Sequence, residues 1–278
     1  MFQITTIARI SLCCLAGFAI DLHSQTQTPG ATTPAPQDPA ISSTDFDDLA
    51  ARYSGQRPVH WGTKIPGVYA RFQTTEPEIA LTFDACRAGF DADMFAVLER
   101  EKVCATVFVA GPWLKLNTDA AKKLAASPWI EIENHGTNHR PLSVNGRGIY
   151  HLRGTQNPSE VIHEIEDNAK QIESLTGRRP RLFRPATGYC DDVAVRIAND
   201  LGYAVATFNV LGDEGATLTG GPMTDAIARA SAGDIVIVHI NHPRAGAAPA
   251  LEKAIQQLRG KGFAFVKLGD RINHLRAP

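Results

Sequence analysis

The sequence predicts one α/β domain in which parallel strands alternate with helices in a closed or nearly closed (β/α)7 barrel. Three observations favour this fold class. Short apolar runs recur along the chain, amphipathic helical patterns separate them, and 278 residues are enough for one large domain but few for two. Alternating strands and helices imply parallel strands covered by helices, because parallel neighbours need long crossover connections.

Each expected strand is a short run of apolar or β-branched residues, and each expected helix is an amphipathic segment between two such runs. The seven strands are residues 79–83, 103–109, 130–133, 182–183, 204–208, 235–238 and 263–266. The helices are residues 91–101, 119–126, 159–176 (with Gly177 as a stop), 191–201, 224–230 and 249–260. In a barrel of this kind, reactive side chains are expected just after the strands.

The N-terminal region is typical of an exported protein. Residues 1–24 contain an apolar run at 10–20 and small residues at Gly17 and Ala19, which predicts a secretory signal peptide; a transmembrane anchor is the weaker alternative because the run is short. Residues 25–45 are rich in Thr, Pro, Gln and Ala and predict a linker, so the folded domain is expected at 46–278. We expect a periplasmic or extracellular protein with no transmembrane segment in the mature chain.

The charge composition excludes some classes of partner. The formal net charge is −1 and no Lys/Arg block stands out, so nucleic acid and acidic membrane surfaces are not expected partners. The composition does not indicate the oligomeric state.

Three cysteines remain after removal of the predicted signal peptide. Cys104 lies in an apolar run and is expected to be a buried small hydrophobe. Cys86 and Cys190 each follow a predicted strand, and a disulfide between them is one hypothesis, because exported proteins fold in oxidising compartments. An odd number of cysteines leaves at least one free thiol.

Two polar clusters follow the first and third expected strands. Asp84 ends the first run; a lone acid there is more often a cap or turn residue than a catalyst. His135 and His139 follow the third run, four residues apart. Two neutral imidazoles suit Zn²⁺ with an open position for water, whereas the alternative is a pair of loop histidines bonded to the backbone.

Two more clusters follow later strands. Arg184 could hold a carboxylate in a two-pronged hydrogen bond, and the turn after it could present backbone N–H groups to an oxyanion. The alternative is a helix start capped by Asp191 or Asp192. His239 ends an apolar strand, where an imidazole can act as a general acid or serve as a structural histidine.

Together, in this order and spacing, the four clusters resemble the polysaccharide deacetylase family (NodB-homology domain, carbohydrate esterase family 4) over residues 68–268. The resemblance implies a distorted (β/α)7 barrel of that type. It also implies a metal-dependent hydrolase that removes N-acetyl groups, or alternatively O-acetyl groups, from a cell-envelope or extracellular polysaccharide. The implied cofactor is a divalent metal, Zn²⁺ first, with Co²⁺ or Ni²⁺ as alternatives. The implied partner is an acetylated polysaccharide or oligosaccharide.

The resemblance assigns roles residue by residue. Asp84 matches the base that takes a proton from a metal-bound water, and Arg184 matches the arginine that orients this base. His135 and His139 match the metal-binding histidines, and His239 matches the acid that protonates the leaving amine.

The sequence departs from the family pattern at the third metal ligand. Ala85 stands where the family usually has a second aspartate, and alanine cannot coordinate a metal. Either Asp84 itself binds the metal, or Asp91 or Asp93 replaces the missing ligand, or water does.

The residues on the substrate side are assigned by the same resemblance. Asp213 is the candidate for tuning the acid, and Phe208 is either an aromatic wall or a core residue. Thr187 stands where tyrosine is frequent, with Tyr189 two positions on, and the backbone near Thr187 is expected to hold the oxyanion.

Two other functions remain open at this stage. The loss of the aspartate at position 85 favours a catalytically weak or inactive glycan-binding barrel. A metal-dependent amidase or deformylase acting on a small molecule is a third hypothesis, which the predicted signal peptide and linker disfavour. The loop at 140–156 is expected to decide substrate access. The sequence does not identify the glycan.

Overall fold

The computed structural model describes residues 43–277, so the predicted signal peptide and nearly all of the predicted linker lie outside the described residues. The first described element is helix α1 (Ser43–Tyr53), which begins slightly before the predicted start of the domain. Within the described part of the chain, no helix has the length and apolar character needed to cross a membrane.

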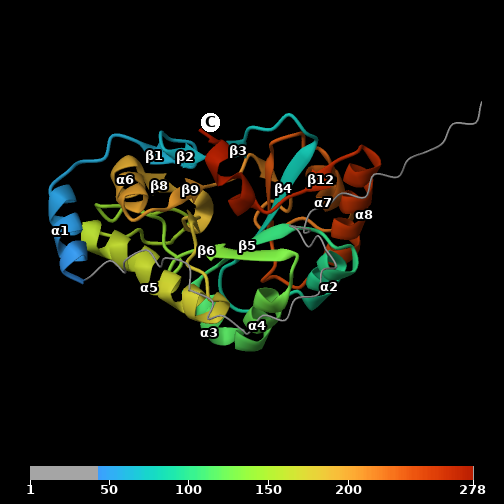
Figure 1. Ribbon diagram of the computed structural model, residues 1–278, viewed down its shortest axis with the longest axis horizontal. Helices are drawn as coiled ribbons and strands as arrows, with labels where there is room; N and C mark the ends of the chain where they lie inside the picture. The colour runs from blue at the N-terminus through green and yellow to red at the C-terminus, as the bar shows by residue number, and fades with distance from the viewer. Residues whose placement is uncertain (1–42, 278) are drawn as a thin grey trace, which may run out of the picture.

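The centre of the fold is a curled sheet of parallel strands (Figure 1). Its order is β10 (Val210–Leu211), β11 (Ile235–His239), β4 (Glu78–Ala85), β5 (Ala105–Val109), β6 (Ile130–Asn134), β7 (Leu182–Phe183), β9 (Ala204–Ala206) and β2 (Val68–Tyr69). Strand β12 (Ala264–Phe265) pairs with the first residues of β4. Among residues 43–277 no pairing joins β10 to β2, so the sheet forms a half-barrel.

The predicted fold class and all seven predicted strands are confirmed, with small differences at the strand ends. Strands β2 and β10 were not predicted, because two residues are too few to show a pattern. Two antiparallel pairs flank the half-barrel: β1 (Trp61–Gly62) with β8 (Cys190–Asp191), and β3 (Arg71–Phe72) with β13 (Leu275–Arg276).

Helices cover the outer face of the sheet. They are α2 (Ala92–Arg100), α3 (Gly111–Leu116), α4 (Thr118–Ala126), α5 (Pro158–Thr176), α6 (Asp192–Asp200), α7 (Gly220–Ala228) and α8 (Ala247–Gly260). Figure 1 shows α1 against α5 at one end of the molecule and α8 at the other. The described residues also form two 3₁₀ segments, η1 (Ala186–Gly188) and η2 (Leu268–His274). The six predicted helices are confirmed, whereas α1 and the six-residue α3 were not predicted.

Side chains alternate between the two faces of β4. Leu81, Phe83 and Ala85 pack into the apolar core between the sheet and the helices. The residues between them turn to the inner face of the half-barrel, where a Thr82 hydroxyl donates to the Val236 carbonyl. Asp84 is therefore an inner-face residue at the carboxyl end of the strand, as the two-residue period of a strand requires.

The strand register determines which inner-face side chains are neighbours at the carboxyl ends of the strands. His239 pairs with Asp84 across β11 and β4, and Asp84 pairs with Phe108 across β4 and β5. Polar side chains separated by more than a hundred residues in sequence are thereby brought together where reactive groups are expected in barrels of this kind.

Helix α3 lies against the turn that follows β6. The Gly111 N–H donates to the Gly136 carbonyl at 2.9 Å, and a Cβ at position 111 would overlap the carbonyl oxygen of Thr137. The absence of a side chain at Gly111 therefore permits the close approach between this helix and the turn.

We predict that Gly111→Ala lowers the free energy of unfolding by about 1–3 kcal/mol, because helix and turn must separate to admit the methyl group. The control is Gly260→Ala in α8, where a Cβ meets nothing within 4 Å. That variant should match wild type or exceed it by up to about 1 kcal/mol. Urea unfolding measures both, and equal stability of the two variants would contradict the close packing.

Candidate active site

The structure brings four predicted site residues together at the carboxyl ends of inner strands. Asp84 lies near the end of β4, His135 follows β6, Arg184 follows β7, and His239 ends β11. Asp84, His135 and Arg184 are almost fully buried, and His239 is partly buried. Charged groups of this kind are buried only when they are paired.

Arg184 and Asp84 form a buried ion pair. Arg184 Nη1 donates to Asp84 Oδ1 at 2.7 Å, while its Nε and Nη2 donate to the backbone carbonyls of Ala206 and Thr207. The guanidinium also lies 4.0 Å from the ring centroid of Phe108. Burial alone would raise the pKa of Asp84, but electrostatic interactions with the neighbouring His135 and Arg184 lower it below its ordinary value. The carboxylate is therefore ionised and fixed in direction.

The hydrogen bonds of His135 determine which ring nitrogen can bind a ligand. Its Nδ1 lies 2.7 Å from the carbonyl oxygen of Arg184, so Nδ1 carries the proton and donates it. Its Nε2 lies 3.4 Å from Asp84 Oδ2. Burial lowers the pKa of His135 despite the nearby carboxylate, so the ring is neutral and Nε2 presents a lone pair. This arrangement is typical of a metal-ligating histidine.

His139 is buried without a polar partner. It is 9% exposed, neither ring nitrogen has a hydrogen-bond partner, and its ring centroid lies 4.8 Å from that of His135. Burial and the neighbouring His135 lower the pKa of His139 to about 3, so the ring is neutral. Leaving a buried polar group unpaired costs about 1–3 kcal/mol. A neutral imidazole with a free lone pair beside another fits a divalent metal ion.

Cys86 lies beside the two histidines. Its Sγ is 3.6 Å from His135 Nε2, and the donor atoms of Cys86, His135 and His139 all lie within 4.8 Å of one another. Burial raises the pKa of the Cys86 thiol, and the charges of Asp84 and Asp213 raise it further. The thiol is therefore protonated in the metal-free protein.

The predicted disulfide between Cys86 and Cys190 is wrong: both residues are free thiols. Cys190 lies on β8, and its Sγ contacts the carbonyl oxygen of Gly62 on the paired strand at 3.8 Å, whereas Cys86 faces the histidines. Cys104 is buried, as expected for a small hydrophobe.

Asp91 and Asp93, the two alternative ligands, lie at the start of helix α2. Asp91 is the N-cap of α2, where its Oδ1 accepts the Met94 N–H at 2.9 Å. Asp93 lies exposed in the first turn of the same helix. Among residues 43–277, the cluster of possible metal donors contains Cys86, His135 and His139 and neither of these aspartates, so the structure favours neither as the replacement ligand. Ala85 points into the apolar core.

His239 is paired with Asp213, as expected. Its Nδ1 lies 3.0 Å from Asp213 Oδ1, and its backbone N–H donates to Oδ2 at 2.6 Å. Burial alone would lower the pKa of His239, but the hydrogen bond to Asp213 and its negative charge outweigh burial and raise it. His239 therefore keeps its proton to a higher pH than an ordinary imidazole.

The expected substrate-side residues lie on the turn after Arg184. Thr187 is in the left-handed region at φ 65°, inside η1, and Tyr189 follows with its ring 5.8 Å from Trp61 and 6.1 Å from Tyr150. Sequence reasoning missed the last two members of this aromatic group, which come from separate loops. Tyr150 belongs to the loop at 140–156 and is 67% exposed.

Phe208 has the expected core role, and its role as an aromatic wall stays a prediction. It is a partly buried residue packed on the apolar cluster of the inner face, and its ring centroid lies 5.8 Å from the guanidinium carbon of Arg184. It therefore lies beside the arginine while also extending the core.

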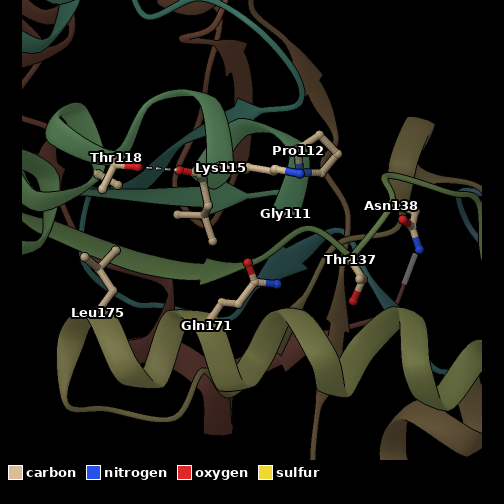
Figure 2. Close-up of a pocket in the computed structure, with 10 residues that line it drawn as sticks. Gly111, Pro112, Lys115, Thr118, Thr137, Asn138, Gln171 and Leu175 are labelled. Atoms are coloured by element: carbon tan, nitrogen blue, oxygen red, sulfur yellow. Dashed lines mark hydrogen bonds between the residues drawn. The ribbon is translucent and has the colours of Figure 1, made fainter.

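A separate hollow of about 640 Å³ lies on the outer side of the sheet, between α3, α4 and α5 (Figure 2). Figure 2 shows Gln171 and Leu175 on α5 facing this hollow, with Thr137 and Asn138 at its rim. None of the site residues named above lines the hollow, and the Thr137 and Asn138 side chains are bound to α5. We assign no chemistry to it.

Comparison with known proteins identifies related sequences and a related family. The model of the polysaccharide deacetylase family matches residues 72–206. A peptidoglycan-N-acetylglucosamine deacetylase of Bacillus cereus is 26% identical over 72% of this chain and 90% of its own length. An uncharacterized protein of Bacillus subtilis, YlxY, is 25% identical over 81% of this chain, and the match spans 66% of that protein.

Solved structures share the fold. A carbohydrate esterase family 4 pseudoenzyme from Bacillus anthracis superimposes with a TM-score of 0.63 at 22% identity, over 74% of this chain and 69% of its own. A mutant of that pseudoenzyme is described as having restored enzymatic activity. At this identity the likeness establishes the fold alone.

We predict that Arg184→Met lowers the free energy of unfolding by about 3–5 kcal/mol, because it leaves Asp84 charged, buried and unpaired. The control is Arg259→Met, which breaks an exposed ion pair with Glu101 and should cost no more than about 1 kcal/mol. Adding Asp84→Asn to Arg184→Met should recover part of the loss. Denaturant unfolding of wild type, Arg259→Met, Arg184→Met, Asp84→Asn and the double variant tests this, and additive losses would contradict a coupled pair.

Proposed function

This chain belongs to the polysaccharide deacetylase family over residues 72–206, and we propose that it is a metal-dependent hydrolase that removes acetyl groups from a cell-envelope polysaccharide. The observation that carries the proposal is one cluster of polar side chains on the inner face of the half-barrel. It contains an ionised, oriented carboxylate, two neutral imidazoles with available lone pairs, and an acid histidine with its own carboxylate partner.

His135 and His139 fit a divalent metal, Zn²⁺ first, with Co²⁺ and Ni²⁺ as alternatives. The fit rests on the unpartnered nitrogens of His139 and on the Nδ1 hydrogen bond that directs His135 Nε2 toward it. Such an ion acts as a Lewis acid toward an acyl carbonyl and lowers the pKa of a water.

Asp84 is the proposed general base. Its Oδ1 is bound to Arg184, and its Oδ2 lies 3.4 Å from His135 Nε2, so the free oxygen points toward the histidine pair. A water attacking an acetyl carbonyl at that position would lose its proton to Oδ2. Arg184 acts on the reaction by keeping Asp84 ionised and oriented, without contacting the substrate.

His239 is the proposed general acid. It has to be protonated before the C–N bond breaks, and Asp213 favours that state. The Nδ1 bond to Asp213 leaves Nε2 to donate to the leaving amine. We assign the backbone at Thr187 to the oxyanion, on the grounds of its place after Arg184 and its left-handed conformation.

We propose an N-acetylated glycan as the substrate, with peptidoglycan as the first candidate. The support is the peptidoglycan deacetylase named among the relatives and the aromatic group of Trp61, Tyr150 and Tyr189, whose ring faces suit sugar C–H surfaces. The signal peptide and linker expected from the sequence support export to the periplasm or beyond. Ala85 favours one competitor, an inactive glycan-binding barrel, which the next experiment separates.

We predict that the purified protein contains stoichiometric metal and releases acetate from N-acetylglucosamine oligomers or peptidoglycan. Asp84→Asn should lower kcat by roughly 10²- to 10⁴-fold through loss of the base, while His135→Ala should lose both metal and activity. His163→Ala is the control, since that histidine is exposed on α5. Absence of both metal and turnover on every acetylated glycan tested would support the binding protein instead.

We predict a kcat profile whose alkaline limb lies above the ordinary imidazole pKa of about 6.5, because activity is lost as the pH rises through the raised pKa of His239. Asp213→Asn removes the negative charge that raises this pKa. It should move the alkaline limb to lower pH by about one unit or more. Asp225→Asn, at an exposed position on α7, should leave the limb in place. An unmoved limb in Asp213→Asn would exclude His239 as the titrating acid.

A further inference from the structure

We propose that the Cys86 thiolate is the third protein ligand of the metal, in the place left vacant by Ala85. The inference rests on the proposed metal-dependent function and goes beyond it by defining the donor set as one sulfur and two imidazole nitrogens. It also assigns Asp84 to catalysis rather than to the metal.

The pleat of β4 accounts for the position of Cys86. Ala85 is the last residue of the strand and packs into the outer apolar core, while Asp84 is on the inner face. Because faces alternate with a period of two, the residue after Ala85 returns to the side of Asp84. An extended backbone thus carries Cys86 toward the histidines and turns position 85 away from them.

The distances agree with a tetrahedral site. With metal–sulfur and metal–nitrogen bonds of about 2.3 and 2.05 Å, a tetrahedral angle places the two donor atoms about 3.6 Å apart. Cys86 Sγ and His135 Nε2 are 3.6 Å apart. The widest separation in the triad of Cys86, His135 and His139 is within 4.8 Å, so a rotation of the His139 ring would complete the set.

His139 is the independent sign of a ligand here. Both of its nitrogens are buried without a partner although the ring lies against His135, and no polar side chain is bonded to it. Asp84 cannot supply both oxygens to the metal, because Oδ1 is occupied by Arg184. With Cys86 as a ligand, Asp84 Oδ2 stays available as the base.

The donor set predicts a choice of metal. One thiolate and two imidazoles favour Zn²⁺ or Co²⁺, whereas Mg²⁺ and Ca²⁺ require oxygen ligands. When the metal–sulfur bond forms, the Cys86 S–H bond breaks and its proton leaves to solvent, so binding releases a proton and tightens as the pH rises.

The test adds Co²⁺, as a substitute for zinc, to the metal-free protein. Its absorption spectrum is then recorded without substrate. We expect a sulfur-to-cobalt charge-transfer band in the near ultraviolet for wild type. The band should persist in the control Cys190→Ser and be absent from Cys86→Ser. Chelator competition should show zinc binding weakened by at least roughly 100-fold in Cys86→Ser, since even losing a supporting partner of a ligand costs about 10- to 100-fold.

Cys86→Asp keeps the test informative if the serine variant folds poorly. It should bind Co²⁺ with visible d–d absorption but without the sulfur band. Absence of the band from wild type that binds Co²⁺, or its persistence in Cys86→Ser or Cys86→Asp, would overturn the inference.

Acetate release, measured on the same preparations, separates the two proposals. A wild-type protein with metal and activity but no sulfur band refutes the role of Cys86 and leaves the deacetylase standing. A protein with the sulfur band but no activity on any acetylated glycan refutes the deacetylase and leaves the metal site standing.

Discussion

The site depends on the burial of one guanidinium. Arg184 uses its side chain to hold Asp84 ionised and its backbone carbonyl to fix the tautomer of His135, so one residue orients both the base and a metal-binding imidazole. Two backbone carbonyls and the ring of Phe108 hold it in place. Strand β7 is only two residues long, and the Arg184 N–H continues its pairing with β6 by donating to the Asn134 carbonyl at 2.9 Å.

Two residues of the site have features that lower the stability of the fold. His139 combines a left-handed backbone with two unsatisfied nitrogens, and Thr187 is also left-handed. Each feature costs free energy in isolation and persists because the apolar packing on both faces of the sheet compensates for it. The combination of a left-handed backbone and two unpartnered ring nitrogens at His139 is typical of a site that is completed by a ligand.

The sequence predicted the elements that repeat a strong pattern. Apolar runs located seven parallel strands, and polar residues just after them identified Asp84, His135, Arg184 and His239 as neighbours. Sequence reasoning missed contacts set by tertiary packing: two-residue strands have no periodicity, and the approach of Cys86 to His135 joins residues 49 apart. The disulfide hypothesis failed for the same reason, because it needed a distance that sequence does not contain.

The alternation of side chains between the two faces of β4 also affects how relatives are judged active or inactive. A sequence alignment compares residues by their position along the chain. In such an alignment, Ala85 stands at the position of a metal ligand and indicates that this ligand is lost. The structure shows that position facing the hydrophobic layer, while the next residue faces the histidines. A coordinating group that moves one step along a strand end changes its aligned position but can keep its place in space. Classifying family members as pseudoenzymes from one aligned position would therefore overlook such relocated donors.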